Sequence, residues 1–322
     1  MGKYLNRGEA VHCPYRRDYL FRSYLFIPNG SEPILDGIKN VLSIYRQPEG
    51  HWVGDGFPVH TVLDYQRHPE LSPFLLLDHA GPADFPPAEK PRGVGWHPHR
   101  GFETVTVVLD GEVDHEDTAG NGGRIAAGDV QWMTAGSGLL HKEMHSDAFT
   151  RRGGRFHALQ LWVNLPAKSK MTAPRYQTLL ASQIPAVGPV RVIAGEYRGA
   201  KGPAQTFTPV NLLDVRLRAN ASVELNLRDG YSAGLYVVEG KINVNGESAN
   251  GGELVVLDRK GDEVVIEALA DAIVLVMNGA PIDEPVAGYG PFVMNTPREI
   301  QQAFADYHAG RLGKIPAAEN VT

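Results

Sequence analysis

Histidine and glutamate side chains recur at two-residue spacing in this chain, and this spacing is typical of metal-binding β-strands. His97 and His99 lie in the stretch GWHPHRGFE at residues 95–103, and His141 and Glu143 follow the glycine-rich stretch GSGLL. Successive side chains of a strand point to opposite faces, so residues i and i+2 share a face. Two such strands in one barrel would offer three imidazoles and a carboxylate to its interior. This donor set leaves coordination positions open on a six-coordinate metal.

Glu103 is a second candidate for the carboxylate of this site. In a regular strand that starts at His97, residues 97, 99, 101 and 103 share one face, so Glu103 could also reach the metal. The step from Arg100 to Gly101 could break this alternation. The spacing alone does not decide between Glu103 and Glu143.

The competing interpretation is that these histidines are ordinary hydrogen-bonded residues. A single His-x-His pair is weak evidence for a metal, because buried polar groups are generally hydrogen bonded inside a protein. The second pair and the glycine-rich turn before it favour the metal site. His115 and His145 are weaker candidates, and we expect each of them on an exposed strand end or a loop.

The composition excludes several classes of protein. The 322 residues include 36 glycines, 23 prolines and one cysteine, Cys13, and the formal net charge is −6. Nucleic-acid binding depends on neutralising phosphates, so this acidic chain is not expected to bind DNA or RNA directly. A disulfide framework is impossible with one cysteine. No apolar run approaches the roughly 20 residues of a membrane span, and no signal peptide is apparent, so we expect a cytoplasmic protein.

Short apolar runs separated by turn residues predict an all-β fold. Runs rich in valine, leucine, threonine and aromatic residues are typical of strands. They lie at 39–46, 57–66, 72–80, 102–117, 128–136 and 158–165, and again at 210–220, 222–228, 233–246, 252–259, 262–269 and 271–279. Residues 78–93 and 117–129 predict loops. A capping box at Thr296–Glu299 predicts one C-terminal helix, which ends near Gly310 and packs on a barrel.

An internal repeat indicates that the strands form two copies of one unit. The stretch VVLDGEV at 107–113 matches YVVEGKI at 236–242, and Gly128-Asp129-Val130 matches Gly252-Glu253-Leu254. The second copy carries no histidine between His157 and His308, so it cannot build an imidazole site. We expect it to be structural, or to supply a wall for the first copy.

Several blocks of the sequence resemble the pirin family of two-barrel cupin proteins. They are HWVGDGFPVHT, ELSPFLLLDHAGP, PRGVGWHPHRGFETVTVVLDGEV, GDVQWMTAGSGLLHKEM, LQLWVNLPAKSKM and GPFVMNT. The resemblance covers residues 38 to 313. It implies two cupin (jelly-roll) barrels, the first at 38–172 with the metal site and the second at 173–295 without ligands. An extension at 1–37 precedes them, and a helix and tail follow at 296–322.

The resemblance also implies a ligand set and an activity. The ligands would be His97, His99, His141 and Glu143, usually with Fe(II), although another divalent transition metal is possible. Some pirins resemble quercetin 2,3-dioxygenases, which open a flavonol ring with dioxygen and release carbon monoxide. Glu143 or Glu103 would then accept the substrate proton. Four residues, Trp96, Phe102, Trp132 and Met133, could form an apolar wall for a flat ring, but plain core packing is the favoured interpretation for them.

The main alternative is a protein without catalytic activity. Other pirins resemble redox-sensitive, iron-binding regulators of a transcription factor or a metabolic enzyme, and the acidic charge suits a protein partner. An isomerase or a storage-type cupin is a third possibility. Loss of flavonol-dependent oxygen consumption in His97→Ala would distinguish the enzyme from the regulator.

Overall fold

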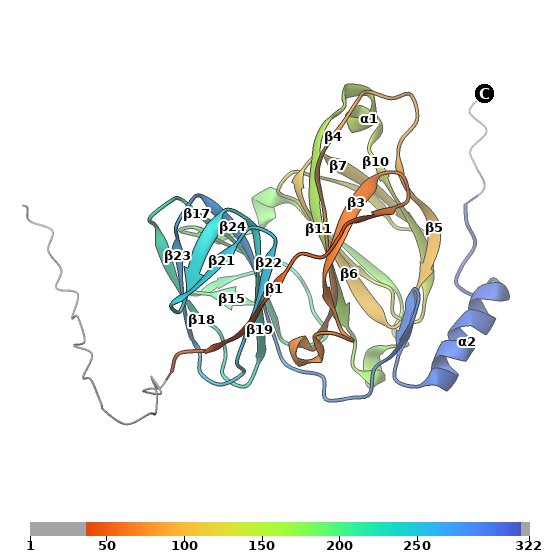
Figure 1. The fold of residues 1–322 in the computed structure, drawn as a ribbon. Coiled ribbons are helices and arrows are strands. Elements are labelled where there is room, and N and C mark those ends of the chain that lie inside the picture. The colour runs from red at the N-terminus through yellow and green to blue at the C-terminus, as the bar shows by residue number, and fades with distance from the viewer. Residues whose placement is uncertain (1–36, 317–322) are drawn as a thin grey trace, which may run out of the picture. The chain divides into compact units, whose positions relative to one another are not determined.

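Two β-barrels make up the part of the chain that the structure describes, as the sequence predicts. The computed structural model describes residues 37–316, and the predicted extension lies almost wholly outside this range. Each barrel pairs a seven-stranded sheet with a four-stranded sheet (Figure 1). No helix within residues 37–316 is long and apolar enough to cross a membrane.

The first barrel forms from strands in the first half of the chain. Its large sheet has the order β12 (Arg175–Leu179), β9 (Val130–Thr134), β6 (Phe102–Asp110), β11 (Gly154–Asn164), β4 (Phe74–Phe85), β3 (Phe57–Asp64), β2 (His51–Val53). Its small sheet has the order β5 (Gly93–His99), β10 (Leu139–His145), β7 (Glu112–Asp117), β8 (Gly122–Ala126). The pairs are antiparallel throughout, and most paired strands are not consecutive in the chain.

The second barrel repeats this plan. Its large sheet has the order β1 (Val41–Arg46), β22 (Glu253–Leu257), β19 (Ser232–Glu239), β24 (Ala272–Gly279), β17 (Val210–Leu217), β14 (Val190–Ala194), β13 (Ala186–Val187). Its small sheet has the order β18 (Ser222–Asn226), β23 (Glu263–Ala268), β20 (Lys241–Val244), β21 (Glu247–Asn250). Two further strand pairs join β15 (Glu196–Tyr197) to β16 (Ala200–Lys201), and β25 (Ala287–Tyr289) to β26 (Phe292–Met294).

The matched glycines of the repeat occupy equivalent turns. Gly111 joins β6 to β7 with φ 90°, and Gly240 joins β19 to β20 with φ 88°. A side chain at Gly240 would lie 2.1 Å from the carbonyl oxygen of Asp271, so only glycine fits there. The duplication inferred from a short sequence match is therefore a duplication of structure.

Each large sheet receives an edge strand from the chain segment next to the other barrel. β1 precedes the first barrel in the sequence but pairs with β22 of the second. β12 follows the first barrel and still pairs with its β9. Figure 1 shows β1 beside β22. The second barrel therefore takes one edge strand from the part of the chain that precedes the first barrel.

A buried hydrogen-bonded chain crosses between the barrels. His79 of β4 hydrogen bonds through Nδ1 to the Tyr236 hydroxyl of β19 at 2.6 Å, and through Nε2 to His157 Nε2 at 2.6 Å. The three residues lie within or beside the apolar side chains that the two large sheets bury against each other. Burial and the neighbouring His157 lower the pKa of His79 to about 3, so its imidazole is neutral at pH 7.

Two of the predicted loops are partly strand. β4 continues to Phe85, so only residues 86–92 of the expected loop at 78–93 are irregular. The expected loop at 117–129 contains β8, which pairs with β7. Both segments are rich in glycine, proline or small residues, and tertiary pairing overrode this local preference.

Both α-helices of residues 37–316 begin at a side-chain cap. α1 (Asp147–Arg152) starts at Ser146, and α2 (Pro297–His308) starts at the predicted capping box of Thr296. Three 3₁₀ turns lie at Pro69–Leu71, Ala167–Ser169 and Ala181–Gln183. α2 packs on the first barrel, and its Asp306 accepts a 2.7 Å hydrogen bond from Arg100, the residue after His99.

The unfolding free energy should fall in acid because of His79. Below its ordinary pKa of 6.5 the unfolded chain binds a proton at this residue, and the folded chain does not until about pH 3. Stability present above pH 6.5 is therefore lost as the pH falls through this window, by about 2 kcal/mol down to pH 5. Urea titrations should show this loss shrinking in His79→Gln. An unchanged pH dependence in the variant would contradict the assignment.

Candidate functional site

The small sheet of the first barrel places the histidine pairs side by side. β10 lies between β5 and β7, and His141 is opposite His97 on one side and Asp117 on the other. Glu143 is opposite His115. Nitrogen atoms of His97, His99 and His141 all lie within 4.8 Å of one another. The pairing that the two-residue spacing predicted is therefore present across β5 and β10.

The large sheet faces this cluster with amides and hydroxyls that bind Glu143. Gln131 donates to Glu143 Oε1 at 2.9 Å, Gln160 donates to Oε2 at 2.9 Å, and the Thr106 hydroxyl donates to Oε1 at 3.3 Å. These donors come from the adjacent strands β9, β11 and β6 at one level of the sheet. Three donors to one carboxylate offset the cost of burying its charge.

The imidazoles of β5 each present one free nitrogen. His97 Nδ1 is 2.8 Å from the Gly95 carbonyl oxygen, and His99 Nδ1 is 3.3 Å from the Pro291 carbonyl oxygen. A carbonyl oxygen only accepts, so each Nδ1 carries the proton and each Nε2 keeps its lone pair. This is the tautomer in which Nε2 binds a metal, with the other nitrogen oriented by its own partner.

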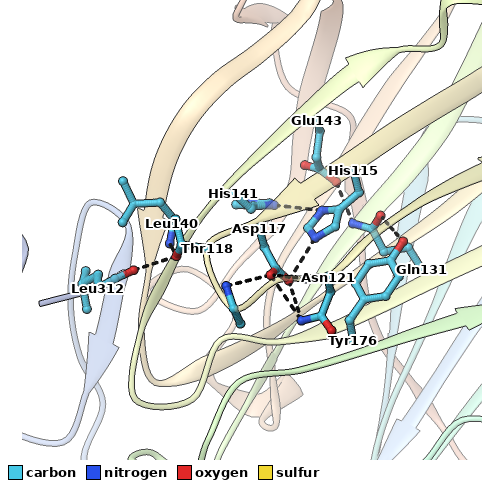
Figure 2. A network of polar contacts seen from close by, with 11 residues as sticks. His115, Asp117, Thr118, Asn121, Gln131, Leu140, His141, Glu143, Tyr176 and Leu312 are labelled. Atoms are coloured by element: carbon cyan, nitrogen blue, oxygen red, sulfur yellow. Dashed lines mark hydrogen bonds and ion pairs between the residues drawn. The ribbon is translucent and has the colours of Figure 1, made fainter. Parts of the chain in front are cut away.

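A chain of three buried side chains fixes His141 in the same way (Figure 2). Asp117 Oδ2 lies 3.4 Å from His115 Nε2, and His115 Nδ1 lies 3.4 Å from His141 Nδ1. The Asp117 carboxylate accepts from His115 Nε2, and in this tautomer His115 accepts at Nδ1 from the Nδ1 of His141. His141 Nε2 is then left with a lone pair. It is buried, and no described residue hydrogen bonds to it.

Burial keeps the His99 and His141 imidazoles in the neutral form, which is the form that binds metals. Burial, together with the neighbouring imidazoles, lowers the pKa of His99 to about 3 and that of His141 well below its ordinary value. Burial raises the pKa of Asp117, but hydrogen bonds from His115 and Asn121 outweigh it, and the pKa lies below the ordinary value. Neutral His99 and His141 are therefore in the state that binds a divalent transition metal.

These residues fit a metal ion by a structural criterion. A buried nitrogen without a partner costs free energy, and His141 Nε2 is such a nitrogen. A metal held by the three Nε2 atoms would satisfy it. His115, His141 and Glu143 form a second group within 4.8 Å of one another, whereas the group of His97, His99 and His141 does not include Glu143.

Glu103 does not join the cluster. β5 ends at His99 and β6 begins at Phe102, and Gly101 between them has φ 88°. The alternation of side chains between the two faces of the sheet is interrupted at Gly101. Glu103 therefore points away from the interior of the first barrel, although it is buried. Thr134 donates to its Oε1 at 2.7 Å. Burial raises the pKa of Glu103 to about 7, against smaller lowering effects of its hydrogen bonds.

A small cavity adjoins the cluster, and the four residues considered as an apolar wall do not line it but pack in hydrophobic clusters, as the favoured interpretation predicts. Its polar lining is Asp78, His97, Thr106, Glu143 and Gln160, and its apolar lining includes Val53, Phe57, Val59, Val113 and Phe156. The four residues considered as a wall lie elsewhere. Trp132 is in the core between the large sheets, Met133 packs on Tyr176, Phe102 stacks on Trp162, and Trp96 packs with the α2 side chains. Buried β residues alternate between two cores, and the sequence does not say which core each faces.

The expectation that His115 and His145 are exposed is wrong. His115 is 4% exposed and stacks on Tyr176 at 4.6 Å, and His145 is 2% exposed. His145 Nε2 lies 3.0 Å from the Gly56 carbonyl oxygen and its ring stacks on Phe156. The alternation along DHED could have indicated that His115 shares a face with Asp117, but nothing in the sequence indicated its contact with His141.

The second barrel holds no comparable cluster among the described residues. Its interior is filled by aliphatic side chains, including Leu225, Val244, Val264 and Ile266. The groups of histidine and carboxylate side chains close enough to share a metal all lie in the first barrel.

Comparisons with known proteins agree with the fold. The family model described as Pirin matches residues 56–163, and that described as Pirin C-terminal cupin domain matches 212–313. The chain is 51% identical over 281 residues to a Pseudomonas aeruginosa protein named provisionally as a quercetin 2,3-dioxygenase, covering 85% of this chain and 98% of that protein. It is 40% identical over 268 residues to a pirin-like protein of Solanum lycopersicum, covering 81% and 88%.

Solved structures extend this likeness. A crystal structure of quercetin 2,3-dioxygenase from Acinetobacter baumannii superposes with a TM-score of 0.85 at 47% identity, covering 87% of this chain and all of that chain. The Escherichia coli pirin YhhW, solved with nickel(II), shares the fold with a TM-score of 0.58 at 21% identity, covering 74% of this chain and all of that one.

Replacing His115 by phenylalanine should weaken metal binding without unfolding the barrel. The ring would still stack on Tyr176, but His141 would lose the acceptor that orients it. Loss of such a partner typically lowers metal affinity by about 10- to 100-fold. Competition with a chromophoric chelator would measure this, with His308→Phe, an exposed residue of α2, as the control. Equal affinity in both variants would contradict the role of His115.

Proposed function

The chain belongs to the pirin family, and we propose that its first barrel is a metal-dependent dioxygenase that opens the ring of a flavonol-like substrate. The observation that carries the proposal is the set of three imidazoles with free Nε2 atoms beside a hydrogen-bonded carboxylate, at the wall of a largely apolar cavity. The names of similar proteins from Pseudomonas and Acinetobacter support the substrate class.

We assign His97, His99, His141 and Glu143 as the metal ligands. Fe(II) is the preferred candidate for the metal. Imidazole and carboxylate donors also accept nickel, copper, zinc and manganese, so the metal has to be measured. When bound, the metal would supply Lewis-acid chemistry that lowers the pKa of a coordinated hydroxyl, together with open positions for substrate and dioxygen.

The residues of the chain supply binding and proton transfer. Glu143 lines the cavity and is the base that would take the substrate hydroxyl proton. Gln131, Gln160 and Thr106 hold its carboxylate in place. The apolar walls exclude water from a flat ring and so favour ring opening over competing reactions with solvent. Glu103, on the other face of the sheet, is a less suitable base than Glu143.

Reaction with quercetin is the direct test. We expect anaerobically iron-loaded protein to consume quercetin on addition of air and to release carbon monoxide. His97→Ala and Glu143→Ala should lower the rate by at least about 100-fold, the low end for general acid–base catalysis. Flavonol absorbance and released gas would be followed together. A fully loaded protein without turnover would sink the proposal and favour a redox-sensitive regulator, to be sought by protein capture in both iron states.

The cavity must widen to admit such a substrate. Its volume of about 60 Å³ is well below the roughly 300 Å³ or more of a typical small-molecule pocket. Val53 and Phe57, on the hairpin of β2 and β3, form part of the wall. The tip of this hairpin is held to β5, because Asp55 N donates to the Gly93 carbonyl at 3.2 Å and Gly93 N donates to Asp55 Oδ1 at 2.8 Å.

Loosening this attachment should speed substrate entry. Asp55→Ala removes a hydrogen bond to a charged group at the hairpin tip, so opening should become about 10-fold more frequent. Hydrogen exchange of the β2 and β3 amides and the association rate of quercetin would measure it. Asp84→Ala, an exposed carboxylate of β4, is the control. Unchanged exchange in Asp55→Ala would show that the hairpin is not the gate.

A further inference from the structure

One polar residue that lines the cavity, Asp78, neither belongs to the candidate metal cluster nor hydrogen bonds to it. Among the polar lining residues, His97 belongs to the imidazole group, and Thr106 and Gln160 bind Glu143. Asp78 remains. Within the described residues its carboxyl has one hydrogen-bond partner, the Thr61 hydroxyl, which donates to Oδ1 at 2.6 Å. Oδ2 has no partner there.

The strand register places Asp78 at the level of the groups that hold Glu143. Thr61 of β3, Asp78 of β4, Gln160 of β11, Thr106 of β6 and Gln131 of β9 are successive cross-strand partners. Directly opposite residues share a face of the sheet and have Cα atoms about 4.5–5.5 Å apart. Asp78 therefore lies one strand beyond Gln160, on the same interior surface as the Glu143 carboxylate.

The surroundings of Asp78 favour a hydrogen-bonding ligand. Burial raises the pKa of Asp78, while the bond from Thr61 lowers it, and no described lysine or arginine forms an ion pair with it. A carboxyl oxygen against an apolar wall gains free energy when a donor reaches it. Two carboxyl groups and no lysine or arginine line the cavity, which suits a neutral hydroxyl compound better than a carboxylate.

We propose that Asp78 binds a second hydroxyl of the substrate, distinct from the one that meets Glu143. The substrate class is then a flat aromatic compound with at least two hydroxyl groups, one directed at each carboxyl. Asp78 is a specificity-determining residue in this arrangement. The proposal rests on the proposed function, because it takes the reacting hydroxyl to lie at Glu143 and adds a second point of recognition.

Anaerobic binding of two flavonols tests the proposal without turnover. The probes are quercetin and 3-hydroxyflavone, which keeps the reacting hydroxyl but lacks the others. Iron-loaded wild-type protein should bind quercetin more tightly. In Asp78→Leu the quercetin affinity should fall at least tenfold, the range for a hydrogen bond to a charged group, and the 3-hydroxyflavone affinity should stay within about twofold. Asp78→Asn, which keeps an accepting oxygen but not the charge, should retain part of the preference.

The controls separate this proposal from the function it rests on. Asp84→Leu makes the same change at an exposed position of β4 and should not alter the preference. Asp78→Ala replaces Asp78→Leu if the leucine variant does not fold. If wild type turns over quercetin and the Asp78 variants keep the same preference, the dioxygenase stands and the role of Asp78 is wrong. If wild type binds neither flavonol, the proposed function fails and the role of Asp78 fails with it.

Discussion

The register of β10 between β5 and β7 is the constraint on which the candidate site depends. Side chains of a strand alternate between faces, so this register alone decides that His141 and Glu143 face the barrel interior together with His97 and His115. A slip by one residue would turn the cluster to the other face. The irregularity between His141 and Glu143 in the pairing with β5 adjusts the positions of these residues without changing the face.

The two sheets of the first barrel contribute different residues to the candidate site. The small sheet supplies the imidazoles and their orienting partners, and the large sheet supplies the amides and hydroxyl that hold Glu143. The ligands proposed for the metal therefore depend on both sheets staying in contact across the barrel. Each free nitrogen is set by a partner at the opposite side of its ring, so the site is arranged before any metal enters.

The sequence carried enough information for the fold class, the duplication and the paired histidines, because strand alternation and turn residues are local signals. It could not decide between Glu103 and Glu143, since the answer depends on the backbone at Gly101, where φ is 88°. The contact of His115 with His141, and the donors from Gln131 and Gln160, come from strands distant in the sequence. Their register is fixed only by tertiary pairing, which composition and spacing do not encode.

The positions of the edge strands β1 and β12 limit which deletions the fold can accommodate. Removing either barrel would take with it β1 or β12, and a strand of the remaining sheet would be left with unpaired N–H and C=O groups. Such an edge pairs readily with other chains and promotes aggregation. We therefore expect deletion of the second copy to expose a strand edge of the first barrel, even though this copy carries no histidine between His157 and His308.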